Sequence, residues 1–114
     1  MTAVIHHARL AWDGAMAFVG ASAHPDLYGW LAERLTDVLG PIGGEALAET
    51  RVRLTHSRRP DAPQVESGRW RARLEDVLDA APELSGPLGT LINDTRLRLR
   101  EVQPQADVMP WRAR

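Results

Sequence analysis

The sequence predicts an all-α domain, a bundle of four or five helices, on three observations. Apolar residues recur at spacings of three and four along most of the chain, which is typical of helices with one buried face. Glycine and proline pairs separate these stretches, as expected of helix ends. The length of 114 residues, with 44% hydrophobic and 25% charged residues, is that of one ordinary globular domain.

The first predicted helix precedes a Gly-Ala-Ser-Ala break at residues 20–23. Gly14 weakens this helix by about 1 kcal/mol relative to alanine. We expect its apolar stripe to face the core, and Trp12, like Trp30 and Trp70, to lie at or near a buried stripe. The members of the stripe are Ile5, Ala8, Trp12, Ala15 and Val19.

The second helix begins at Pro25, since the first helical turn tolerates a residue without an N–H group. Gly40 followed by Pro41 ends it. Its buried stripe consists of Leu27, Leu31, Leu35, Val38 and Leu39.

A loop at residues 42–44 (Ile-Gly-Gly) is expected next, with a third, partly exposed helix from Glu45 to the region of residues 56–59. Residues 58–63 contain two prolines and no apolar period, and they predict a further loop.

The fourth helix has the most complete stripe, and Pro82 ends it. The stripe contains Trp70, Leu74, Val77, Leu78 and Ala81. A fifth helix follows, with its regular part from about Leu88, and we expect the last two helices to form an antiparallel hairpin. The residues on its apolar side are Leu84, Leu88, Leu91, Ile92, Thr95, Leu99 and Val102.

We therefore expect one helical domain over residues 1–102 and an extended or disordered tail over residues 103–114. The tail carries the first candidate interaction site, whose aromatic residue cannot build a core of its own. It either docks on its own domain or enters a groove of a partner. The site comprises Val108, Met109, Trp111 and Arg112.

The sequence contains arginine but no lysine, and many of the arginines lie in the middle of the chain. A basic face there could contact phosphate, so a helical nucleic-acid-binding regulator is the alternative function. Acidic residues share the same region and the net charge is −1, which favours solvated faces with internal ion pairs. The alternative basic patch comprises Arg51, Arg58, Arg59, Arg69, Arg71 and Arg73.

Catalytic and metal-binding motifs are missing from the sequence. Cysteine is absent, and no histidine pair has the spacing of four residues that brings two imidazoles together on a helix. We expect no cofactor, no metal and no catalytic residues, and an enzyme or small-molecule binder is the least favoured reading. The longest nearly apolar stretch, residues 14–23, is half of the ~20 residues that cross a bilayer. With no export signal at the N-terminus, the expected location is the cytoplasm.

Two short motifs resemble small, uncharacterised all-helical proteins of actinobacteria. These are W-R-x-R-L, present at residues 70–74, and P-E-L, present at residues 82–84. The likeness covers residues 30–99. It implies a helical module without a reaction, a cofactor or a catalytic residue to carry over. The arginine-only composition is also typical of a GC-rich bacterium. The leading hypothesis is thus a non-enzymatic interaction or regulatory module that uses a helical face, the tail, or both. Its protein partner is unknown, and self-association is expected as one form of binding.

Overall fold

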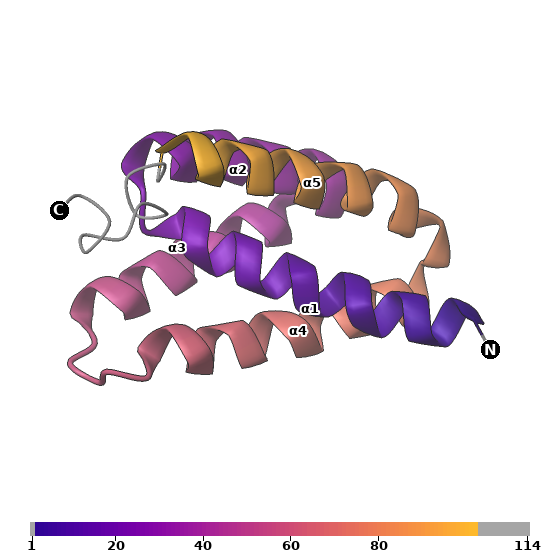
Figure 1. Cartoon of the computed structure of the whole chain (residues 1–114), viewed down its shortest axis with the longest axis horizontal. Coiled ribbons are helices and arrows are strands. Elements are labelled where there is room, and N and C mark those ends of the chain that lie inside the picture. The colour runs from indigo at the N-terminus through magenta and orange to yellow at the C-terminus, as the bar shows by residue number, and fades with distance from the viewer. Residues whose placement is uncertain (1, 103–114) are drawn as a thin grey trace, which may run out of the picture.

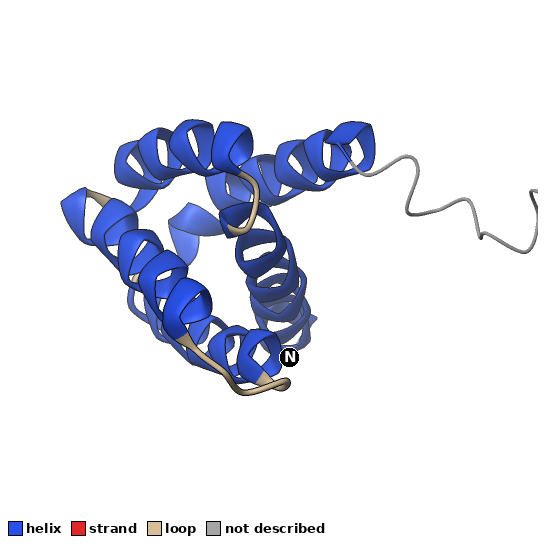
Figure 2. Ribbon diagram, turned by 90° about the vertical axis from the view of Figure 1, so that its left-hand side faces the viewer, coloured by secondary structure: helices blue, strands red, loops and turns tan. Residues whose placement is uncertain are grey.

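A computed structural model describes the backbone of residues 2–102 and the side chains of residues 7–102. This part of the chain is helical nearly throughout and has no β-strand (Figures 1 and 2). The predicted all-α class is confirmed. The elements are α1 (Thr2–Ser22), α2 (Pro25–Leu39), α3 (Pro41–His56), α4 (Ala62–Ala80), a 3-10 turn η1 (Pro82–Leu84) and α5 (Ser85–Val102).

Consecutive helices run in opposite directions, and α1 occupies the centre of the arrangement. It contacts each of the other four α-helices. In Figure 1, α1 (indigo) runs in front of the bundle, with α4 (pink) below it and α5 (orange) above it. Since the first helix is surrounded on several sides, the shared core is built around it. No helix between Thr2 and Val102 combines the length and apolar character needed to cross a membrane.

Small residues on α1 allow this close packing. Ala11, Ala15 and Gly14 are all buried. A Cβ atom at Gly14 would lie 2.9 Å from the terminal Cδ1 atoms of both Leu74 on α4 and Ile92 on α5. The glycine that weakens the helix locally therefore leaves room for side chains of both α4 and α5 against α1.

Part of the predicted stripe on α1 was wrong. Ala15 and Val19 are buried, but Ala8 is exposed and 50% of Trp12 is accessible to solvent. The buried arc is broader than one stripe because several helices contact α1, and it is filled by small residues together with Phe18. An indole in that arc would separate the neighbouring helices. The predicted break was also early, since the helix continues through Gly20 to Ser22.

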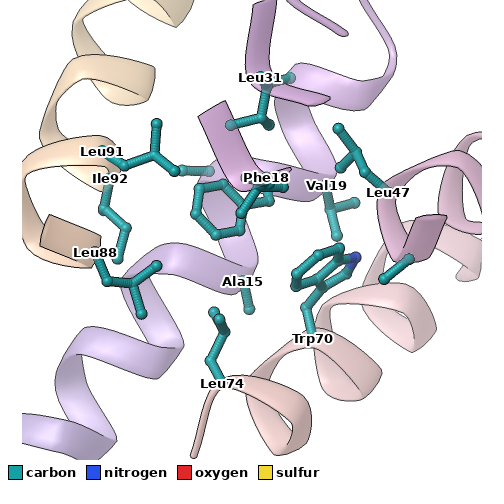
Figure 3. Packing of buried hydrophobic residues seen from close by; sticks show 14 of the residues in the cluster. Ala15, Phe18, Val19, Leu31, Leu47, Trp70, Leu74, Leu88, Leu91 and Ile92 are labelled. Atoms are coloured by element: carbon teal, nitrogen blue, oxygen red, sulfur yellow. The ribbon is translucent and has the colours of Figure 1, made fainter. Parts of the chain in front are cut away.

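Phe18 and Trp70 form the centre of the core (Figure 3). Their ring centroids are 5.5 Å apart and their planes meet at 75°, an edge-to-face contact that aromatic pairs favour. Trp70 is fully covered, as predicted, and Trp30 lies half-buried at the rim. The leucines and the isoleucine around the two rings come from α2, α3, α4 and α5; those labelled in Figure 3 are Leu31, Leu47, Leu74, Leu88, Leu91 and Ile92.

The connection between α2 and α3 is a single residue, Gly40, whose φ of 85° is costly for any residue with a side chain. The predicted end of α2 is confirmed, but the predicted loop at residues 42–44 is wrong because α3 already begins at Pro41. A Cβ atom at Gly43 would lie 2.6 Å from the carbonyl oxygen of Leu35. The glycines there serve close helix packing rather than a loop.

The α4 helix also begins earlier than predicted, at Ala62 instead of beyond residue 63. Pro63 falls in its first turn, where a missing N–H group removes no helical hydrogen bond. The loop is confined to residues 57–61. At the other end, α4 stops at Ala80 as expected, and its N-terminal extension adds Glu66 to the buried residues.

The last two helices are antiparallel and joined by a tight turn, as predicted, with Leu84 in the η1 turn and α5 beginning three residues before Leu88. They do not form a closed hairpin, because α1 packs against both of them and lies between them (Figure 1). The predicted connection is thus confirmed, while the space between the two helices is filled by the first helix of the chain.

Candidate functional site on the outer face of helix α1

The outer face of α1 carries two large apolar side chains one helical turn apart. Trp12 is 50% and Met16 53% exposed, and residues four apart lie on the same side of a helix. We call Trp12, Met16 and the neighbouring Gly20 the α1 face. None of these three residues is charged, while the exposed Arg9 lies on the same side of the helix, one turn before them.

Charged residues frame the α1 face along both edges. On the α4 side, the guanidinium carbon of Arg71 lies 5.6 Å from the centre of the Trp12 ring, within the range of a cation–π contact. On the α5 side, Arg96 Nη1 lies 3.9 Å from Asp13 Oδ2. An apolar strip with a polar border is the usual anatomy of a protein–protein interface.

An apolar hollow of about 470 Å³ continues the α1 face at the end of the bundle. It lies where the end of α1 meets the end of α3 and the start of α4. Met16 belongs both to the α1 face and to the wall of the hollow, so the two form one continuous surface. The hollow is lined by Met16, Val19, Gly20, Ala23, His24, Leu54, Ser57, Arg59, Ala62, Pro63 and Ser67.

A second region, between α3 and α4, is polar and consists of internal bonds. The indole Nε1–H of Trp70 donates to Thr50 Oγ1 at 2.7 Å, and the Thr50 hydroxyl donates to the Ala46 carbonyl at 3.0 Å. All of these groups are buried, so the chain of bonds satisfies the one polar atom of the core tryptophan.

Glu66 extends this polar region and is 4% exposed. Its Oε2 accepts a hydrogen bond from Arg53 Nε at 2.9 Å and lies 3.6 Å from Arg69 Nε. This bond, strengthened by the attraction between the two charges, raises the pKa of Arg53. Within the described residues Oε1 has no hydrogen-bond partner. The carboxylate ties α4 to α3, which otherwise touch over a short length.

The six arginines of the predicted basic patch do not share one surface. Arg51 donates to the Ser22 carbonyl at 2.7 Å and lies over the Tyr28 ring at 4.8 Å. Arg71 lies over Trp12, and Arg73 over Trp70 at 5.9 Å. Arg69 and Arg73 line a groove of about 550 Å³ between α3 and α4, and Arg69 also lines a neighbouring hollow of about 350 Å³ together with Arg59.

Arg58 and Arg59 lie in the loop before α4, both exposed. Arg59 bonds both carboxylate oxygens of Asp61 at 2.9 Å, and this contact lowers the pKa of Asp61. The groove between α3 and α4 is also lined by Arg53, which is not among the six predicted residues. The arginines thus point in several directions, and most are held by partners within the domain.

One hollow does bring together residue types used in catalysis. His56, Ser57 and Glu66 line a space of about 350 Å³. They are bonded elsewhere: His56 Nδ1 lies 3.0 Å from the Val52 carbonyl, and the Ser57 hydroxyl accepts the Arg59 N–H. Glu66 is held by Arg53. Among the side chains of residues 7–102, no three from histidine, aspartate or glutamate gather as metal ligands.

The predicted tail site, comprising Val108, Met109, Trp111 and Arg112, lies outside the described residues. Comparison with models of protein families, with curated proteins and with solved structures finds no match. The likeness to small actinobacterial proteins therefore stays a prediction, and the site must be interpreted from its own geometry.

The α1 face itself was missed by sequence reasoning, although its signal is present. Trp12 and Met16 have the spacing of one helix face, but Trp12 also falls on the predicted apolar stripe, which predicts a place at the core. The Glu66–Arg53 pair has no local signal, since it joins two helices across 13 positions of the sequence.

Proposed function

We propose that this chain is a non-enzymatic protein-interaction module that binds a partner through the α1 face and the adjoining hollow. The observation that carries the proposal is the exposure of Trp12 and Met16 on the helix that organises the core. Tryptophan is enriched among residues that dominate binding energy, and methionine adapts its shape to varied partners. A cytoplasmic location in an actinobacterium belongs to the same proposal on the grounds of sequence alone.

The bound partner is expected to place apolar side chains over Met16 and into the hollow, which removes apolar surface from water. Arg71 supports this contact, because its guanidinium over the Trp12 ring holds the indole at the surface. The polar border then sets the orientation of the partner. Self-association through the same face is one form of this binding.

The test compares two double variants as bait in a lysate of the source bacterium. Trp12→Ala with Met16→Ala removes the α1 face, while Ile42→Ala with Val52→Ala removes two other exposed apolar residues from α3 as the matched control. We expect wild type and control to retain a partner, identified by mass spectrometry, that the α1-face variant loses. Light scattering of the same three proteins reports self-association. Equal capture and equal mass for all three proteins would remove the proposal.

The nucleic-acid alternative makes a different prediction, since binding through phosphates weakens steeply with salt. The α1 face contains no charge, so binding there is expected to persist at high salt. DNA or RNA binding at low salt that survives the Trp12→Ala, Met16→Ala variant would favour the alternative.

A further inference from the structure

The apolar hollow lies close to the end of the last described helix. A Cβ atom at Gly20, which lines the hollow, would lie 3.5 Å from Cδ1 of Leu99 on α5. From Leu99, α5 continues for three residues to Val102, about 4.5 Å along the helix. Since α1 and α5 run in the same direction, α5 ends beside the end of α1 (Figure 1).

The sequence that follows α5 has the reach and the composition to fill this hollow. Residues 103–107 (Gln-Pro-Gln-Ala-Asp) precede the apolar residues 108–111 (Val-Met-Pro-Trp). Five extended residues span roughly 17 Å, whereas crossing a helix such as α1 requires about 10–12 Å. The crossing point, at Gly20 and Ala23, has almost no side chain in the way.

We propose that residues 108–111 bind in the hollow of their own chain, with Trp111 among Met16, Leu54 and Ala62. The hollow presents the apolar surface that an indole covers, and the neighbouring Met109 and Val108 match its remaining wall. The prolines at positions 104 and 110 fix two backbone angles in advance, which reduces the entropy lost on docking.

The chain's own segment has an advantage over a second copy or a partner. A short linker holds it at an effective concentration in the millimolar range, so a competitor must bind with enough affinity to displace it. In this respect the inference rests on the proposed function, because docking of residues 108–111 would compete with the partner for Met16 and the hollow. The segment then acts as a built-in competitor that lowers the apparent affinity for the partner.

The absence of cysteine in the sequence allows a direct test by disulfide trapping. The full-length chain with Met16→Cys and Met109→Cys is compared with Ile42→Cys and Met109→Cys, in which the first cysteine lies at the far end of α3. We expect the first pair to form an intrachain disulfide about tenfold faster than the control, at a rate independent of protein concentration. Equal rates would overturn the proposal. A disulfide between chains, faster at higher concentration, would assign the hollow to a second copy instead.

A second measurement avoids any change to the hollow. Trp111→Ala in the full chain is expected to raise the fluorescence of a dye that binds exposed apolar surface, while Arg114→Ala leaves it unchanged; no rise for Trp111→Ala contradicts the docking. Partner capture separates the two proposals. Trapping without any partner leaves the intrachain contact standing and removes the proposed function. If a partner is captured through Trp12, capture is unaffected by Trp111→Ala and the two cysteine pairs react at equal rates, the proposed function stands and the intrachain docking is removed.

Discussion

Around Gly14, the inner side of helix α1 is built from small residues, whereas the outer side carries Trp12. Ala11, Gly14 and Ala15 are buried, while Trp12 and Met16 are about half exposed. If burial alone decided the arrangement, the tryptophan would be inside, because a fully buried large side chain contributes more than a methyl group. The difference shows that close approach of α4 and α5 determines the inner side, which leaves the outer side available for binding.

The largest difference in the free energy of unfolding is expected between substitutions of the two aromatic residues of α1. Phe18→Ala is expected to lower the free energy of unfolding by about 3–5 kcal/mol, because it removes a fully buried ring that contacts Trp70. Trp12→Ala is expected to change it by only about 0.5 kcal/mol, as for other surface positions. Urea denaturation followed by circular dichroism measures both. Equal losses would mean that Trp12 belongs to the core.

A smaller effect is expected from added volume on the inner side. Gly14→Val is expected to lower the free energy of unfolding by about 1–3 kcal/mol, since its side chain meets Leu74 and Ile92. The control is Gly68→Ala on α4, where a Cβ atom meets nothing within 4 Å. It is expected to stabilise the helix by up to about 1 kcal/mol. Thermal unfolding distinguishes the two, and a stabilising Gly14→Val would refute the close-packing argument.

The smallest effect is expected from the hydrogen bond that joins Trp70 on α4 to Thr50 on α3. Thr50→Val leaves the indole N–H buried without an acceptor, and a loss of about 1–2 kcal/mol is expected. Thr36→Val is the matched control, because this exposed threonine makes the same bond to the carbonyl four residues earlier but receives none from a side chain. Chemical denaturation measures the free energy of unfolding of the two variants. If Thr36→Val lowers it as much as Thr50→Val, the bond to the indole is not the cause.

The helices could be predicted from the sequence where leucine stripes are bounded by Gly40-Pro41 or Pro82, since these signals are local. Their packing could not. Apolar periodicity ranks residues by hydrophobicity, so it cannot tell that a glycine such as Gly14 lies inside and Trp12 outside when one helix is contacted on several sides. Likewise, nothing near Gly43 in the sequence shows that the carbonyl of Leu35 lies against it.

The sequence predicts an interaction surface in the tail, whereas the surface proposed from the structure lies on α1. An interaction surface was expected from the lack of catalytic motifs and from the apolar residues 108–111, which lie outside the described part of the chain. The α1 face and the hollow depend on contacts between α1, α3 and α4, residues as far apart as Met16 and Ser67. Such contacts follow from the three-dimensional packing and have no signature in local spacing.

The central position of α1 also has a consequence for the order of folding. It is synthesised before the other four described helices, yet its inner side packs against α4 and α5, whose residues follow Phe18 by about 50–75 positions. At 5–20 residues per second, Phe18 waits roughly 4–15 s before Ile92 has been synthesised. Until α4 has been synthesised, α1 can pair only with α2 and α3. Folding of this small helical domain is therefore governed by contacts distant in sequence, and it completes late in synthesis.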